Sequence, residues 1–204
     1  MKILFMRHGE SKSQAKQIEK TAPDSVNALT DTGIEQVKKA ASDFQDKIDA
    51  VYVSPYARTQ LTAQLFLKHL NLDIPIITDN RLREIDYGIF GIEDKKNPEM
   101  IHVATEQIKG NYEIRFGRFG ENKREIVTRF FNFLTDIFNK YSSNDSILAV
   151  THGRAISIVI AEICITNNIP IELASTKNAQ IKEIELTEQT ISNIIKHIEK
   201  INSK

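Results

Sequence analysis

The sequence has no tryptophan, one cysteine, and no apolar run of the roughly 20 residues that a membrane-spanning helix needs. Cys164 cannot form an internal disulfide, and inside the apolar run 156–165 it is expected to be a small core residue, which fits a reducing compartment. No cationic start is followed by an apolar stretch. Neither a signal peptide nor a membrane span is therefore predicted, and the cytoplasm follows by default.

An excess of charge of one sign is also lacking, because 27 lysines and arginines balance 27 aspartates and glutamates. No global field favours nucleic acid or an anionic membrane as a partner, so recognition of an anion must come from a local cluster. Cysteine and histidine do not occur at zinc-binding spacing, and no metal is predicted. With few glycines and prolines and no linker-like stretch, residues 1–204 are expected to form one domain.

Strand and helix patterns alternate along the chain, which predicts an α/β fold, a three-layer sandwich with a mostly parallel central sheet. The expected strands are 2–7, 50–53, 74–78, 146–150 and 179–186, and the expected helices are 33–47, 57–70, 98–108, 121–141 and 153–166. Thr30 or Asp31 could cap the first of these helices. The apolar residues from Ile191 to Ile198 fit helical spacing better than strand spacing.

An arginine and a histidine follow the first apolar run, in the order Arg7, His8, Gly9. The carboxyl ends of strands in open α/β sheets are where ligands usually bind. Arginine offers phosphate two parallel hydrogen bonds, and histidine can act as a nucleophile. The pair therefore suggests phosphoryl chemistry, while a strand end that merely carries two polar residues is the plainer alternative.

A second strand ends in the same way, at Thr151, His152 and Gly153. Neighbouring parallel strands deliver their carboxyl ends to one side of the sheet, so His8 and His152 could face a common pocket. The helix that begins near Gly153 would direct free amide groups at an anion.

Arg58 is predicted in the first turn of a helix, where an unpaired arginine opposes the helix dipole. It could be solvated or paired in a salt bridge at the helix N-terminus. Alternatively, it could be a second clamp on a phosphate held by Arg7.

These motifs together closely resemble those of the histidine phosphatase superfamily, which includes cofactor-dependent phosphoglycerate mutases and many small-molecule phosphatases. They follow the order of the family and span residues 3 to about 153. The matching pieces are Arg7-His8-Gly9-Glu10-Ser11, Leu29-Thr30 with Gly33, Ser54-Pro55 with Arg58-Thr59-Gln60 and Ala63, Leu82-Arg83-Glu84 with Gly88, Gly120-Glu121, and Thr151-His152-Gly153.

The resemblance implies that His8 is the nucleophile and that Arg7, Arg58 and His152 hold the three peripheral phosphoryl oxygens. It also implies that no metal or other cofactor is needed, because the arginines neutralise the charge. Ser11, Gln14 and Gly153 occupy positions where auxiliary phosphate contacts are expected.

Glu84 is implied as the acid that protonates the leaving group and as the base that later activates water. From the residues alone Asp86, two positions later, is a competing carboxylate within a charged run that could also be a solvated loop. The other histidines, His69, His102 and His197, match no motif and are expected to be surface or structural residues.

The chain departs from the family pattern in places. Asn122 stands where the family often has serine, but it retains the ability to cap a helix. The family usually closes with a strand near the C-terminus, whereas the tail here has helical spacing.

The function expected from these residues is a phosphatase that hydrolyses phosphomonoesters through a phosphohistidine, with a small phosphorylated substrate. Mutase-type phosphoryl transfer is the alternative, although residues 83–120 contain no adjacent arginine pair of the kind that the longer mutases carry. A non-catalytic phosphate-binding module is the second alternative, and it would be expected to have lost His8 or the acid. Residues 85–120 are expected to form a lid-like insertion over the pocket, and a homodimer is left open.

Overall fold

A computed structural model describes residues 1–19, 23–88, 98–117, 119–170 and 176–203. The described strands are β1 (Lys2–Arg7), β2 (Ala50–Val53), β3 (Ile76–Thr78), β4 (Ser146–Thr151) and β5 (Ile181–Glu185). The described α-helices are α1 (Asp31–Ser42), α2 (Ala57–His69), α3 (Pro98–Ile108), α4 (Lys123–Lys140), α5 (Gly153–Thr166) and α6 (Glu188–Asn202), and two short 3-10 helices are η1 (Asp24–Val26) and η2 (Asn80–Leu82).

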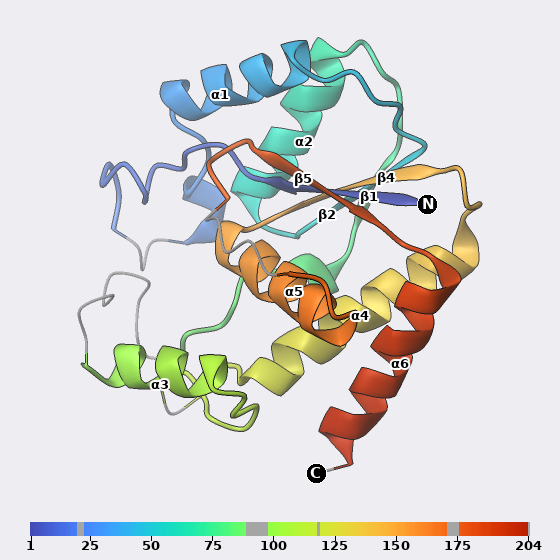
Figure 1. Ribbon diagram of the computed structural model, residues 1–204. Helices are drawn as coiled ribbons and strands as arrows, with labels where there is room; N and C mark the ends of the chain where they lie inside the picture. Colours follow the sequence, from blue (N-terminus) through green and yellow to red (C-terminus); the bar gives the residue numbers. More distant parts are fainter. Residues whose placement is uncertain (20–22, 89–97, 118, 171–175, 204) are drawn as a thin grey trace.

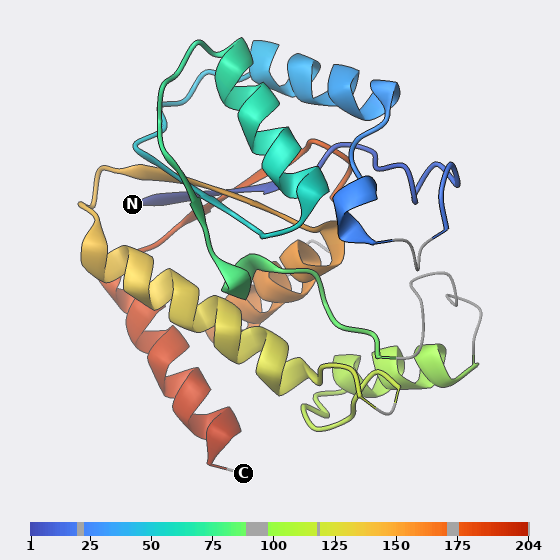
Figure 2. The same cartoon turned by 180° about the vertical axis from the view of Figure 1, so that it is seen from behind.

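The strands form one sheet in the order β3-β2-β4-β1-β5. The first four strands pair in parallel, and β5 pairs antiparallel with β1 at the edge. Helices α1 and α2 lie on one face of the sheet, and α4, α5 and α6 lie on the other (Figures 1 and 2). The predicted α/β fold with a mostly parallel sheet is therefore confirmed.

Alternation along the strands divides the core into two clusters, because successive side chains point to opposite faces of a sheet. In β1, Ile3 and Phe5 pack with the side chains of α4, α5 and α6. Leu4 and Met6 belong to the cluster that contains the apolar side chains of α1 and α2. The inner strands are thus buried on both faces, which explains their nearly continuous apolar sequences.

Several boundaries differ from the sequence expectation. Helix α1 ends at Ser42 rather than near residue 47, because the chain turns there and Phe44 packs edge-on against Phe66 at 5.4 Å. Strand β3 is limited to Ile76–Thr78. The C-terminal tail is helical, as its spacing indicated. Part of the expected lid, residues 89–97 and 118, lies outside the described residues.

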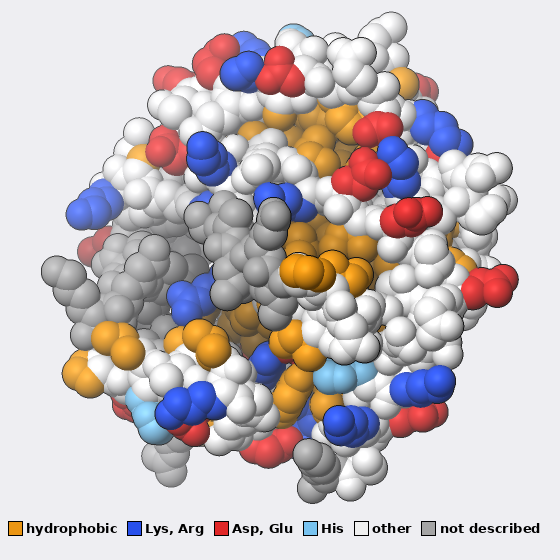
Figure 3. Space-filling model, viewed as in Figure 1, with side chains coloured by type: hydrophobic (Ala, Val, Ile, Leu, Met, Phe, Trp, Pro, Cys, Tyr) orange, Lys and Arg blue, Asp and Glu red, His pale blue; other side chains and the backbone are white. Residues whose placement is uncertain are grey.

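The surface carries both charges interspersed on the face seen in Figure 3. Ile101 and Ile108 of α3 are exposed, Ile108 at 83%. Cys164 is half-buried, so the expectation of a core cysteine is wrong; the last turns of α5 lie at the surface, with Ile165 48% exposed. No helix in the described ranges is both long and apolar enough to cross a membrane.

Candidate active site

The register of two neighbouring strands brings the two histidines together. β1 and β4 pair in parallel with Arg7 beside Thr151, so His8 and His152 leave the same edge of the sheet one residue later. The backbone N–H of His8 donates to the carbonyl of Thr151 at 3.1 Å. The imidazole centroids lie 5.2 Å apart in an edge-on arrangement, and both rings are buried.

One ring nitrogen of His8 carries the proton, and the other keeps a lone pair that faces Arg58. Nδ1 of His8 lies 2.6 Å from the carbonyl oxygen of Gly9, and because a carbonyl only accepts, the proton is on Nδ1. Nε2 accordingly accepts a hydrogen bond from Nε of Arg58 at 3.3 Å. Burial, aided by the charges of Arg58 and Arg7, lowers the pKa of His8 to about 3. His8 is therefore neutral near pH 7 and presents Nε2 as its nucleophilic atom.

Arg58 connects both histidines to a carboxylate. Its Nη2 donates to Nδ1 of His152 at 3.1 Å, and its Nη1 donates to Asp24 at 3.0 Å. The other carboxylate oxygen of Asp24 accepts from the backbone N–H of Ala57, in the first turn of α2, at 2.7 Å. The guanidinium also lies 4.6 Å above the ring of Tyr56. Arg58 thus forms the salt bridge that the sequence left open, and its guanidinium also contacts both histidines.

The ring of His152 has the opposite tautomer to that of His8. Its Nδ1 accepts from Arg58, so Nε2 carries the proton and donates to the hydroxyl oxygen of Ser54 at 2.8 Å. Burial and the charge of Arg58 hold the pKa of His152 well below its usual value. An arriving anion would favour a proton on Nδ1, and the imidazolium could then donate to a phosphoryl oxygen.

Arg7 has a buried donor without an acceptor. Its Nη1 donates to the carbonyl of Thr176 at 2.6 Å, while its Nε is buried and has no hydrogen-bond partner among the described residues. Its side chain runs over Gly153, where an added Cβ would lie 2.8 Å from Cδ and Nε of Arg7. A buried donor on a cation is costly when left unpaired, and an anion held here would satisfy it.

Of the two candidate carboxylates, Glu84 lies in the site. Its Oε2 is 3.9 Å from Nδ1 of His152, and its Oε1 accepts from the backbone N–H of Ile85. Burial raises the pKa of Glu84, although Arg58, Arg129 and Arg7 act in the opposite direction. Asp86 is exposed and accepts from the N–H of Gly88, which is the arrangement of a solvated turn.

Ser11 and Gln14 lie in the loop after β1 and bond to each other rather than to the histidines. Gln14 Oε1 accepts from the backbone N–H of Ser11 at 3.0 Å and from the side-chain amide of Asn178 at 3.1 Å. Asn178 in turn donates to the carbonyl of His8 at 3.2 Å. Within the described residues, no hydrogen bond joins the side chain of Ser11 or Gln14 to His8, Arg7, Arg58 or His152.

The remaining histidines are away from this site. His69 contacts Ser42 at the surface, and His102 is exposed on α3. His197 belongs to a cluster that the sequence did not indicate, in which Glu162 contacts Tyr112, Lys123 and His197. No group of three His, Cys, Asp or Glu side chains in the described ranges is arranged to hold a metal ion.

Sequence reasoning missed Asp24, Ser54 and Thr62 as neighbours of the site. Thr62 accepts from the N–H of Gly9 at 3.1 Å and donates to the carbonyl of Arg58. Ser54 stood inside a motif that was quoted, but its hydrogen bond to His152 depends on the pairing of β2 with β4. Asp24 lies far from Arg58 in the chain and follows no recognisable pattern.

Comparisons with known proteins identify the family to which the sequence is similar. The model of the histidine phosphatase superfamily (branch 1) matches residues 3–196. Phosphoserine phosphatase 1 of Hydrogenobacter thermophilus is 28% identical over 160 residues, which are 74% of this chain and 71% of that protein.

Solved structures share the fold at lower identity. Phosphoserine phosphatase from Entamoeba histolytica, in complex with phosphoserine, superposes with a TM-score of 0.71 at 20% identity, covering 92% of this chain and 91% of the other. A mycobacterial glucosyl-3-phosphoglycerate phosphatase gives 0.72 at 16% identity over 94% of each chain. Phosphoglycerate mutase from Bacillus anthracis gives 0.72 at 19% identity over 96% of each chain.

Proposed function

Because the chain belongs to branch 1 of the histidine phosphatase superfamily, we propose that it is a phosphatase that hydrolyses phosphomonoesters through a phosphohistidine on His8. The observation that carries the proposal is the state of His8, a buried neutral imidazole with its Nε2 lone pair beside Arg58. The Nε of Arg7 supports it: it has no partner within the part of the chain that the structure describes, and a dianionic phosphoryl group would supply an acceptor.

In the first half-reaction, Nε2 of His8 attacks phosphorus while the bond from phosphorus to the ester oxygen breaks. Arg7, Arg58 and His152 hold the peripheral oxygens, and the arginine charges neutralise the transition state without a metal. Glu84, whose pKa burial raises, is the acid that gives a proton to the departing alkoxide. The hydrogen bond from Nδ1 to the carbonyl of Gly9 stabilises the charge that develops on the His8 ring.

In the second half-reaction the roles of Glu84 are reversed. Its carboxylate takes a proton from water, the water oxygen attacks phosphorus, and the bond between nitrogen and phosphorus breaks. The electron pair returns to Nε2 of His8, and inorganic phosphate leaves. One carboxyl group can perform both steps because the second half-reaction runs through the first in reverse.

Hydrolysis is favoured over mutase-type transfer by the pairing of cations in the segment expected to cover the site. A mutase must retain a bisphosphorylated intermediate, which needs additional free cations. In the described part of residues 83–120, Arg83, Lys109 and Arg115 are each paired with a glutamate. The names of the relatives, a phosphoserine phosphatase and a glucosyl-3-phosphoglycerate phosphatase, support a small phosphorylated metabolite as substrate. A non-catalytic binding module is disfavoured because both His8 and Glu84 are present.

The test compares the wild type with His8→Ala on an aryl phosphate. Loss of the nucleophile is expected to reduce kcat by about 10³-fold or more. The wild type, quenched in alkali during turnover of ³²P-labelled substrate, is expected to carry acid-labile label that the variant lacks. His69→Ala, which removes an exposed histidine, is the matched control and should match the wild type. Equal turnover in wild type and His8→Ala would contradict the mechanism.

A further inference from the structure

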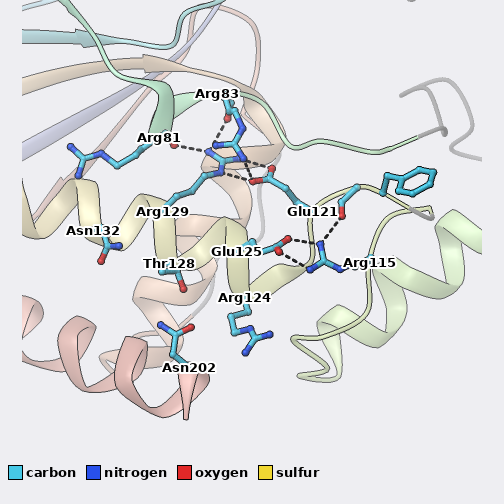
Figure 4. Close-up of a pocket in the computed structure, with 12 residues that line it drawn as sticks. Arg81, Arg83, Arg115, Glu121, Arg124, Glu125, Thr128, Arg129, Asn132 and Asn202 are labelled. Atoms are coloured by element: carbon cyan, nitrogen blue, oxygen red, sulfur yellow. Dashed lines mark hydrogen bonds and ion pairs between the residues drawn. The ribbon is translucent and has the colours of Figure 1, made fainter. Parts of the chain in front are cut away.

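An arginine and a glutamate hold the chain segment that carries Glu84. Arg129 of α4 and Glu121, just before that helix, line a surface groove of about 750 Å³ (Figure 4). In Figure 4 the Arg129 side chain points at Glu121 and at the backbone near Arg81 and Arg83. Residues 120–121 are part of a family motif to which the proposed reaction gives no role.

The guanidinium of Arg129 uses every N–H that it has. Nε and Nη2 donate to the two carboxylate oxygens of Glu121 at 2.9 and 3.0 Å. Nη1 donates to the carbonyls of Arg81 and Arg83 at 2.6 and 2.9 Å. Nη2 also reaches the carbonyl of Glu84 at 3.4 Å. Only the planar fork of arginine can make these contacts together, because an ammonium group has three donors and no fixed plane.

Both carboxylate oxygens of Glu121 also accept more than one hydrogen bond. Besides Arg129, the carboxylate accepts from Nη2 of Arg83 and from the backbone N–H of Asp86 at 3.0 Å. The backbone N–H of Glu121 donates to the carbonyl of Asp86 at 2.8 Å. The pair therefore fixes the main chain on both sides of Glu84. Both side chains are nearly buried, so each charge depends on the other for compensation.

We propose that Arg129 and Glu121 are positioning residues which hold the backbone around Glu84 so that its carboxyl group faces the leaving-group side of His8. This inference rests on the proposed function, in which Glu84 is the proton donor. General acid catalysis requires the acid within hydrogen-bond reach of the leaving oxygen. A displacement of the backbone around Glu84 would therefore slow proton transfer to the leaving group more than it weakened phosphate binding.

Electrostatics adds to the geometric role. The positive charge of Arg129 opposes the effect of burial on the pKa of Glu84. Arg7 and Arg58, which face His8, act on the same carboxyl group, and Tyr87 and His152 lie close to it. By pairing with Arg129, Glu121 weakens the effect by which Arg129 lowers the pKa of Glu84.

The experiment compares Arg129→Lys with Arg115→Lys, a matched control in the same groove. Arg115 forms a bidentate pair with Glu125 and bonds to the carbonyl of Gly120, but it has no bond to residues 81–86. Glu84→Gln serves as the reference for loss of the acid. The quantity measured is kcat/KM for p-nitrophenyl phosphate and for glycerol 2-phosphate. This ratio reports the steps up to alcohol release, and only the alkoxide needs a proton to leave.

We expect Arg129→Lys to reduce kcat/KM for glycerol 2-phosphate by about 10- to 100-fold, and that for p-nitrophenyl phosphate by less than about threefold. Glu84→Gln should show the same contrast more strongly, and Arg115→Lys should show none. Equal losses on the two substrates, or no loss, in Arg129→Lys would overturn the inference. If Glu84→Gln itself shows no contrast, the assignment of the acid fails instead, and activity that survives in His8→Ala would remove the proposed function.

Glu121→Gln is a second variant that tests the same inference if Arg129→Lys does not fold. The neutral amide leaves Arg83 and Arg129 uncompensated, which should lower the pKa of Glu84. The fall in kcat/KM for glycerol 2-phosphate with rising pH should then move to lower pH. An unchanged profile in a folded Glu121→Gln protein would also overturn the inference.

Discussion

At the scale of single residues, the candidate site depends on one glycine that lets an arginine approach a helix. The Arg7 guanidinium lies over the first residue of α5, Gly153, and its buried Nε has no acceptor among the described residues. A site of this kind binds an anion well because its donors are already in place and already out of water.

Gly153→Ala should weaken phosphate binding while changing stability little. The added Cβ would meet Cδ and Nε of Arg7 at 2.8 Å, and the flexible arginine can swing away. We expect KM for an aryl phosphate to rise about tenfold, equivalent to about 1.4 kcal/mol, and the free energy of unfolding to change by less than about 1 kcal/mol. Steady-state kinetics and urea denaturation measure the two quantities.

Gly33→Ala provides the contrast, because its Cβ would collide with the backbone of Glu10, which cannot move aside so easily. That variant should lose stability. An unchanged KM in Gly153→Ala would show that the position of Arg7 does not govern phosphate binding.

What the sequence could predict at this scale follows from where each residue lies in the chain. His8 and His152 could be placed side by side because each ends an apolar run in a parallel sheet. Asp24 and Arg129 could not, because their contacts with Arg58 and with the Glu84 segment join parts of the chain that no local pattern links. The sequence also could not tell which ring nitrogen of His8 is the nucleophile, because that assignment depends on the hydrogen bond between Nδ1 and the carbonyl of Gly9.

At the scale of elements, the helix ends show which boundaries can be predicted from nearby residues alone. Helix α3 matches the expected residues 98–108, and α1 is capped by Thr30, whose side chain accepts from the N–H of Gly33. Asn122, where the chain departs from the family pattern, forms a full capping box with Glu125 at the start of α4. Caps are encoded within a few residues, whereas the early end of α1 depends on the distant Phe66.

Asn122→Ala should therefore destabilise the protein, whereas Asn122→Ser should not. The Asn122 side chain is buried and accepts from the N–H of Glu125 at 2.9 Å. Loss of this cap is expected to lower the free energy of unfolding by about 1 kcal/mol, and serine should restore it to within a few tenths. Urea denaturation of both variants measures the difference. Equal stabilities of the alanine and serine variants would contradict the role of the cap.

At the scale of the whole molecule, the equal numbers of acidic and basic residues leave no net field, so pH acts on stability through particular buried groups. The candidate site contains two such histidines, both held neutral inside the fold. Burial keeps the His8 imidazole neutral and nucleophilic in the native state. In acid, the same histidine is protonated in the unfolded chain, and this lowers the free energy of unfolding.

The free energy of unfolding should accordingly fall as pH decreases below about 6.5. Between that pH and the native pKa of His8, about 3, the unfolded chain binds a proton that the native state does not. Each such histidine contributes up to about 1.4 kcal/mol per pH unit. Glu84, whose pKa is raised, acts with the opposite sign above its ordinary pKa, because there the native state holds the extra proton.

His8→Asn should isolate one of these contributions. Between pH 7.0 and pH 5.5, the wild type is expected to lose about 1.3 kcal/mol more of its free energy of unfolding than the variant does. Urea denaturation at the two pH values measures it, and His69→Asn, an exposed histidine, should follow the wild type. Parallel losses in the wild type and His8→Asn would mean that His8 takes up its proton as readily in the native state as in the unfolded chain. Such an imidazole would be largely protonated in the native state below pH 6.5. A protonated ring nitrogen has no lone pair to attack phosphorus, so the activity of the wild type would then decline between pH 7.0 and pH 5.5.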